Sequence, residues 1–288
     1  MAEILVDNKD CVSPSEVASS FAEKVMPKKA NYNLLKMFLL AIAAGAFVAF
    51  GAHSCLTVMT GTINISWGLA KLIGGIVFST GLMMVVLTGA ELFTGNVLMT
   101  FSVLEKKISF QTLIKSWSVV YIGNFVGSIV IAGLVFLTGA SHNCNDALGV
   151  ITLNTAVAKS NLSFLQAFTS GILCNWLVCL AVWMAACSRR IIGKIFAIFF
   201  PIMIFVASGY EHCVANMFFI PEGIFTKSIN EVVVASNLSQ EALANLTWKG
   251  FAINNLIPVT LGNIAGVVIF VVLLFWMAYL KKGSKSKF

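Results

Sequence analysis

The chain has 288 residues, of which 58% are hydrophobic and only 11% are charged, and its formal net charge at pH 7 is +7. Soluble domains carry about 25% charged residues, so this composition excludes a water-soluble protein and indicates a chain that lies in a lipid bilayer. We attribute the positive charge to membrane topology and expect no binding to nucleic acid.

Residues 1–32 precede the first long apolar run and predict a cytoplasmic segment that contains one amphipathic helix. Ser13, Pro14 and Glu16 form a helix-start pattern, with a hydroxyl cap, proline at the first position and glutamate at the third. Four apolar side chains then fall on one face, namely Val17, Phe21, Val25 and Met26. We therefore expect this helix to lie against the membrane surface.

Six uncharged apolar runs follow, and a membrane-spanning helix needs about 20 predominantly apolar residues. The runs cover residues 37–59, 72–90, 116–140, 162–188, 195–210 and 250–280. The second and fifth are short, and each stops at an acidic residue that is followed by more apolar sequence. We predict an all-α integral membrane protein, with a six-helix pore domain at residues 33–281 and a basic cytoplasmic tail at residues 282–288.

The basic residues predict how the helices are oriented in the membrane. With six spans and the N-terminus inside, all but four of the 19 lysines and arginines fall in cytoplasmic segments, the exceptions being Lys71, Lys159, Lys227 and Lys249. This bias follows the positive-inside rule. We expect a multi-pass protein of the cell membrane (the inner membrane in a bacterium) with both termini in the cytoplasm.

Two short patterns occur twice in the same order. Residues 88–96 align without gaps on residues 208–216, and each copy has a hydroxyl residue, Gly, any residue and Glu, with Asn five positions after the Glu. Residues 123–127 and 262–266 share Gly-Asn-x-x-Gly, a spacing that favours close helix packing. Repeats of three spans have opposite orientations, as in many channels and transporters. The Gly near each Glu predicts a broken helix, whose freed N-terminus favours an anion.

Glu91 and Glu211 are the only acidic residues in the predicted membrane region. An unpaired carboxylate there costs at least ~2.5–3.5 kcal/mol. We therefore expect each glutamate to cap the backbone N–H groups at its own break, with proton transfer as the alternative. Asn96 and Asn216 are expected to be structural at the same breaks.

Two basic side chains lie near the second repeat. His212 occupies the predicted break of the fifth helix, where it could donate or accept a proton near neutral pH. Sequence alone predicts that Lys159 is a solvated loop lysine. The seven cysteines show no metal-binding spacing, and haem-ligand pairs and nucleotide motifs are missing, so we expect no disulfide, metal or cofactor.

Four segments resemble signatures of the formate/nitrite transporter family, namely residues 87–95 (LTGAELFTG), 171–181 (GILCNWLVCLA), 208–217 (SGYEHCVANM) and 255–263 (NLIPVTLGN). The resemblance covers roughly residues 15–282. It implies an aquaporin-like inverted repeat with broken second and fifth helices, and a homopentamer with one pore per subunit.

The resemblance also implies roles for individual residues near the pore centre. His212 would be the central pore histidine, and Thr94, in the loop that breaks the second helix, would be its hydroxyl neighbour. Asn175 and Val178 would contribute from the fourth helix. Lys159 would be the lysine of the outer vestibule, in contrast to the loop role predicted from sequence alone.

The resemblance implies two apolar constrictions as well. Leu82, Phe205 and Phe78 would form the one on the cytoplasmic side, and Leu92 and Phe93 the outer one. A bare anion would cross such rings at high cost, so we expect passage as the neutral acid, with His212 supplying or relaying the proton.

We therefore predict a channel or transporter for small monovalent anions, in contact with membrane lipid and without enzymatic activity. Formate is the preferred substrate, while nitrite, hydrosulfide and short monocarboxylates such as lactate or acetate stay open. Two alternatives come from other classes of protein: a channel for neutral solutes, and a membrane subunit of a redox complex.

Overall fold

A computed structural model of the protein describes residues 10–281. The predicted basic tail and the first nine residues of the N-terminal segment lie outside the described residues. Residues 10–281 are helical throughout, apart from loops and one isolated β-bridge between Cys11 and Ser188. This result confirms the all-α fold class.

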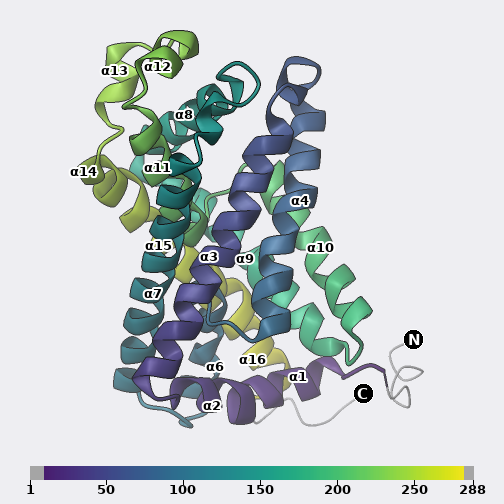
Figure 1. The fold of residues 1–288 in the computed structure, drawn as a ribbon. Coiled ribbons are helices and arrows are strands. Elements are labelled where there is room, and N and C mark those ends of the chain that lie inside the picture. Colours follow the sequence, from purple (N-terminus) through teal and green to yellow (C-terminus); the bar gives the residue numbers. More distant parts are fainter. Residues whose placement is uncertain (1–9, 282–288) are drawn as a thin grey trace.

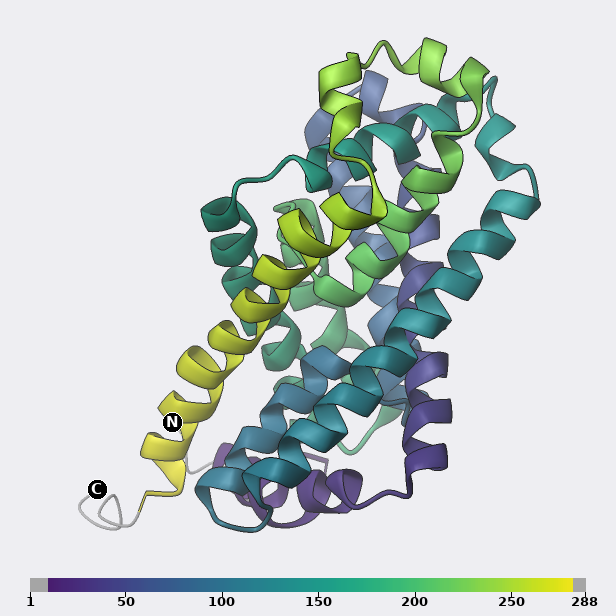
Figure 2. The same ribbon diagram turned by 90° about the vertical axis from the view of Figure 1, so that its left-hand side faces the viewer.

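Five long apolar helices in the described chain are able to cross a membrane. They are α3 (Leu34–Met59), α4 (Trp67–Thr88), α7 (Phe110–Leu137), α9 (Phe164–Cys187) and the continuous helix Trp248–Tyr279. This last helix comprises α14 (Trp248–Gly250), η6 (Phe251–Leu256), α15 (Ile257–Val267), η7 (Val268–Leu273) and α16 (Leu274–Tyr279). Figure 2 shows it as one oblique rod.

Side chains cap all five of these helices at their N-termini, and Thr247 caps the last of them by accepting the Gly250 N–H at 3.0 Å. The other caps are Asn33 for α3, Ser66 for α4, Ser109 for α7 and Ser163 for α9, and each side-chain oxygen accepts a backbone N–H of the first turn. The starts of the helices therefore follow from local sequence, because short polar side chains satisfy N–H groups that have no partner within the helix.

Shorter helices surround the two predicted breaks. After α4 come α5 (Phe93–Asn96), η4 (Val97–Met99) and α6 (Thr100–Leu104). The predicted fifth span consists of two helices, α10 (Ile191–Ala207) and α11 (Cys213–Thr226). Residues 208–212 form the break between them. The second and fifth helices are thus broken as predicted, while the count of six membrane crossings stays a prediction.

Both ends of the described chain lie at the same end of the molecule, which we call the inner end (Figure 1). The opposite, outer end carries α8 (Ala147–Ser160), α12 (Asn230–Ser236) and α13 (Gln240–Ala244). Helix α10 rises from the inner end and α11 continues toward the outer end, while α4 descends from the outer end.

The N-terminal helices lie across the inner end (Figure 1). They are α1 (Pro14–Ser20), η2 (Phe21–Val25) and α2 (Met26–Ala30), and the predicted cap is confirmed, since the Ser13 side chain accepts from the Glu16 N–H. The predicted contact with the membrane surface is wrong. Val17, Phe21 and Met26 are buried against the chain itself, because an apolar stripe packs equally well on protein or lipid.

The glycines of the Gly-Asn-x-x-Gly repeats allow close helix packing, as predicted. A Cβ at Gly127 of α7 would collide with the Ile42 carbonyl of α3, and one at Gly266 of α15 would collide with the Ile172 carbonyl of α9. The first and third spans of each repeat therefore meet backbone to backbone, which is the close approach that small residues permit in membranes.

Candidate functional site

The two helix breaks end α4 and α10 in the same way. Gly89 and Gly209 both have φ of +74°, a left-handed conformation that glycine adopts without steric cost. One residue later, the Ala90 N–H donates to the Val85 carbonyl and the Tyr210 N–H to the Phe205 carbonyl, each at 3.0 Å. The repeated glycine thus ends both helices at equivalent points.

One asparagine braces each break from a neighbouring long helix. Asn124 of α7 accepts the Phe93 N–H at 2.8 Å and donates to the Glu91 carbonyl at 2.9 Å. Asn263 of α15 accepts the Cys213 N–H at 2.9 Å and donates to the Glu211 carbonyl at 3.0 Å. Sequence reasoning found the repeated Gly-Asn pattern but assigned it only to packing. The asparagines satisfy backbone groups that lipid would leave unpaired.

The prediction that Glu91 and Glu211 cap backbone N–H groups is wrong. Each carboxylate instead accepts from the asparagine five residues later, Glu91 from Asn96 at 2.8 Å and Glu211 from Asn216 at 2.7 Å. Glu211 also accepts from Asn255 at 3.1 Å. Asn124 and Asn263 already occupy the first N–H of the next helix, which leaves the carboxylates for side-chain partners.

A lysine neutralises each of these buried carboxylates. Lys159 Nζ lies 2.7 Å from Glu211 Oε1, and Lys29 Nζ lies 3.2 Å from Glu91 Oε1. Lys159 belongs to the last turn of α8, and its side chain is 15% exposed. The predicted solvated loop role is therefore wrong. The sequence analysis did not identify Lys29 as a partner of Glu91. The only indication was its position at the end of the amphipathic segment.

A third acidic side chain is buried among the membrane helices, contrary to the prediction. Glu222 of α11 is 4% exposed, and its Oε1 lies 3.9 Å from His53 Nδ1 on α3. Sequence reasoning ended the fifth apolar run before Glu211 and did not extend the membrane region through α11. A break inside a span hides the second half of that span from a search for uninterrupted runs.

His212 and Thr94 meet at the centre of the molecule. His212 Nε2 lies 3.0 Å from Thr94 Oγ1, and His212 Nδ1 accepts the Ala215 N–H at 3.1 Å, so the ring caps α11. Because Nδ1 acts as an acceptor, the proton of a neutral ring lies on Nε2 and is donated to Thr94. Thr94 lies in the first turn of α5 and not in the loop, which corrects that prediction.

Cavities open toward both ends of the molecule near this pair. The outer side has a small cavity of about 70 Å³ that joins an outer vestibule of about 630 Å³, and Lys71 and Lys159 line both. His212, Phe78 and Phe205 line the small cavity. The two phenylalanine rings meet edge to face, with centroids 5.5 Å apart.

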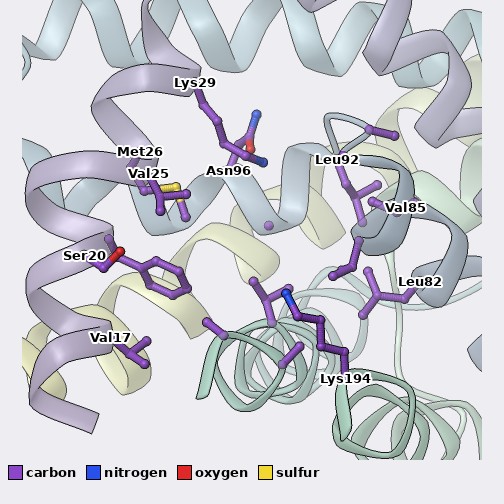
Figure 3. A pocket seen from close by; sticks show the side chains of 18 of the residues that line it. Val17, Ser20, Val25, Met26, Lys29, Leu82, Val85, Leu92, Asn96 and Lys194 are labelled. Carbon is purple, nitrogen blue, oxygen red and sulfur yellow. The ribbon is translucent and has the colours of Figure 1, made fainter. Parts of the chain in front are cut away.

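The inner vestibule has a volume of about 380 Å³ and is covered by the N-terminal helices (Figure 3). Leu82 and Leu92 line it where it approaches the centre, and Lys29 and Lys194 enter it from opposite sides in Figure 3. Phe78 lines the small outer cavity and Leu82 lines the inner vestibule, and the two residues are one helical turn apart on α4. About 6 Å of apolar side chains therefore separates the outer cavity from the inner vestibule.

The predicted sides of the constrictions are wrong for three residues. Phe78 and Phe205 line the outer side, and Leu92 lines the inner side. Helix α4 descends from the outer end, so Phe78 lies farther out than Leu82, and Leu92 follows the end of α4 at the inner side. Phe205 lies near the end of α10, which rises from the inner end.

Three predicted pore residues take other positions. Phe93 packs edge-on against Trp117 and Tyr121 of α7. Asn175 donates to the carbonyls of Thr94 and Asn263, so it links the helix that follows the first break to the asparagine that braces the second. Val178 is buried in the core and is absent from the residues that line the described vestibules.

The arrangement of two vestibules around paired helix breaks agrees with comparisons to known proteins. A family model described as "Formate/nitrite transporter" matches residues 15–277. The chain belongs to the formate/nitrite transporter family. This membership confirms the family resemblance that the sequence motifs indicated.

Two proteins similar to this chain match it over nearly its whole length. "Formate channel FocA" of Escherichia coli (strain K12) is 40% identical over 277 residues, which cover 96% of this chain and 97% of the relative. "Probable formate transporter" of Methanothermobacter thermautotrophicus is 41% identical over 286 residues, which cover 94% and 98%.

A solved structure has a similar fold. The structure described as "Pentameric formate channel with formate bound" is 40% identical and has a TM-score of 0.78, covering 86% of this chain and 98% of that chain. The relatives are channels and transporters, and the chain is accordingly a multi-pass membrane transport protein.

Replacing Asn263 with leucine is expected to lower the thermal unfolding midpoint of the purified protein. The change leaves the Cys213 N–H and the carbonyls of Glu211 and Gly171 without their partner, and each unsatisfied buried group costs about 1–3 kcal/mol. Thermal unfolding in detergent measures the effect. Asn64→Ala, at an exposed position at the end of the short 3-10 helix Thr62–Asn64, serves as the control. Equal midpoints for Asn263→Leu and wild type would contradict the bracing role.

Proposed function

We propose that the chain conducts formate, or a closely related small monovalent anion, through a pore that runs from the outer vestibule past His212 and Thr94 to the inner vestibule. The observation that carries this proposal is the His212–Thr94 pair beside an apolar barrier one helical turn thick. Formate is preferred because similar relatives are named formate channels. Nitrite, hydrosulfide and short monocarboxylates are the alternatives within the family.

The apolar barrier favours a neutral permeant species. Phe78, Phe205, Leu82 and Leu92 offer no hydrogen bonds to a charged carboxylate, and desolvating an ion costs far more than desolvating a neutral molecule. An anion that takes up a proton at the barrier crosses as the neutral acid. The low-dielectric zone itself favours that protonation, since it raises the pKa of the carboxylate.

The hydrogen bonds of His212 suggest how the site assists this step. Its Nε2–H donates to Thr94, so the Thr94 hydroxyl hydrogen is left to donate to a substrate oxygen. For the ring to supply a proton of its own, it must first be protonated on Nδ1, which breaks the bond from Ala215. We propose that His212 mainly orients Thr94, while the proton comes from water through a vestibule.

Formate uptake into proteoliposomes tests the function. Wild-type flux is expected to rise as the pH falls from about 8 to about 5, because the neutral acid forms more readily. His212→Phe is expected to change this pH profile, because it removes the bond that orients Thr94, and to leave assembly intact. Glycerol, nitrite, hydrosulfide and lactate serve as comparison solutes. An unchanged pH profile in His212→Phe would contradict a role in protonation, and flux of glycerol alone would refute anion transport.

We propose that the inner end faces the cytoplasm and that the transmembrane protein has no enzymatic activity. The inner loops carry Lys106, Lys107, Arg189 and Arg190, and Lys115 lies in the second turn of α7. This is the charge bias that the positive-inside rule associates with cytoplasmic segments. The domain limits proposed from the sequence, at residues 32/33 and 281/282, agree with this assignment.

Two native cysteines test the orientation. Cys144 at the outer end and Cys11 at the inner end are the exposed thiols among the described cysteines. In intact cells, a membrane-impermeant maleimide is expected to label Cys144, while Cys11 should react only in inverted membrane vesicles. Cys144→Ser and Cys11→Ser identify the labelled site. Labelling of Cys11 in intact cells would reverse the proposed topology.

We further propose a homopentamer with one pore per subunit. The support is the solved relative described as pentameric and the many large apolar side chains exposed on α3, α7 and α9, which need lipid or other subunits to cover them. Native mass spectrometry of the purified protein is expected to give five times the 31.0 kDa of one chain. A different stoichiometry at several protein concentrations would refute the pentamer.

A further inference from the structure

One buried carboxyl group between the membrane helices has no lysine partner. Glu222 of α11 is 4% exposed, and His53 of α3 is the only basic side chain within ion-pair distance of it in the described chain, with Nδ1 3.9 Å from Oε1. Glu91 and Glu211, by contrast, each bind a lysine and an asparagine. The charge of Glu222 is therefore compensated only by a proton, held either by Glu222 itself or by His53.

Two polar atoms of this pair lack hydrogen-bond partners within residues 10–281. They are His53 Nδ1 and Glu222 Oε2, and both atoms are buried. A side-chain shift of about 1 Å brings the imidazole and the carboxyl group to hydrogen-bond distance. Neither residue lines the two vestibules or the small outer cavity, so the proposed transport mechanism uses neither group.

The other titratable side chains around α11 are engaged elsewhere. The helices α3, α7 and α8 and the segment η6 pack against α11. The titratable side chains on these elements, at the start of α11 and on the adjoining loops bind partners of their own or lie near the inner end or the central break. They are Lys36, Cys55, Lys115, Tyr121, His142, Asp146, Lys159, Cys213 and Lys227. The net charge between α3 and the outer part of α11 thus depends on the protons that His53 and Glu222 hold.

We propose that His53 and Glu222 share one proton and that this neutral pair joins α3 to α11. With one proton the pair has no net charge, whichever group holds it. Release of the proton to water leaves an uncompensated carboxylate at low dielectric constant, and uptake of a second proton leaves an uncompensated imidazolium. The first change is the costlier one, because the carboxyl side chain is 5% exposed and the imidazole 26%. The pair is thus a proton-operated contact between the first helix of one repeat and the broken helix of the other.

This contact positions part of the wall of the small outer cavity. The His53 ring lies edge-on to Phe218 with centroids 6.3 Å apart, and Phe218 lies edge-on to Phe219 at 5.9 Å. Phe219 lines the small outer cavity, and Lys159 Nζ lies 5.3 Å from the centre of its ring. Loss of the contact loosens this part of α11 beside the permeation path. The effect on transport rests on the proposed function, whereas the effect on stability does not.

Thermal unfolding of the purified protein in detergent, from about pH 6 to about pH 9, tests the shared proton. The folded wild type holds a proton that the unfolded chain releases, so its stability falls as the pH rises. Glu222→Gln keeps the shape of the carboxyl group and has no proton to lose, so its midpoint relative to wild type is expected to rise by about 5 °C over this range. Glu231→Gln, at an exposed position of α12, is the control and should follow wild type within about 1 °C. A constant difference between Glu222→Gln and wild type at every pH would overturn the proposal.

A double-mutant cycle tests whether the two residues act as a unit. His53→Leu alone removes the partner of the buried carboxyl group and is expected to lower the midpoint by at least about 5 °C. The double variant His53→Leu, Glu222→Leu replaces the polar pair by apolar side chains and is expected to recover most of this loss. If the effects of His53→Leu and Glu222→Leu simply add, the residues act independently and the pair is refuted.

Formate uptake into proteoliposomes measures the effect on the permeation path. Wild-type uptake divided by that of Glu222→Gln is expected to fall about twofold from about pH 6 to about pH 9, because only wild type loses the contact. Protonation of the substrate affects both proteins equally and cancels in this ratio. A constant ratio would overturn the positioning of the outer cavity by the pair. If wild type takes up no formate at any pH, the proposed function fails, while the unfolding measurements still decide whether the pair shares a proton.

Discussion

Lipid offers no hydrogen bonds, so each backbone group that a broken helix frees must find its partner within the protein. Asn124 and Asn263 meet this constraint at the two breaks, because each side chain accepts an N–H from the far side of its break and donates to a carbonyl on the near side. Asn175 then links Thr94, which follows the first break, to Asn263, which braces the second. The centre of the pore depends on these amide side chains, since they hold Thr94 and His212 at hydrogen-bond distance.

Both halves of the inverted repeat neutralise a buried carboxylate, and they do so in the same way. Each break carries a buried glutamate that binds the asparagine five residues later and is neutralised by a lysine from outside the repeat motif. These lysines come from unrelated elements, since Lys29 lies in α2 of the N-terminal segment and Lys159 lies in the last turn of α8.

The short apolar barrier discriminates between neutral and charged forms of a small solute. Only about one helical turn of apolar side chains separates the vestibules, so a small neutral molecule crosses at low cost. A charged species is desolvated over the same distance with no compensating partner. A barrier of this kind favours the neutral, protonated form of a weak acid over its anion, which agrees with the proposed transport of small monovalent acids.

The sequence by itself determined the membrane location, the broken helices and the roles predicted for Gly89, Gly209 and His212, because these follow from composition and from repeated local motifs. The family, and with it the role predicted for Thr94, came from the resemblance of four segments to the signatures of that family. Only the tertiary structure decided which partners the glutamates bind, on which side of the barrier Phe78, Phe205 and Leu92 lie, and that the N-terminal helix packs on protein. These features depend on groups far apart in the sequence, such as Lys29 and Glu91 or Asn263 and Cys213. A local pattern indicates that a buried charge or a free N–H needs a partner, but three-dimensional packing decides which group becomes that partner.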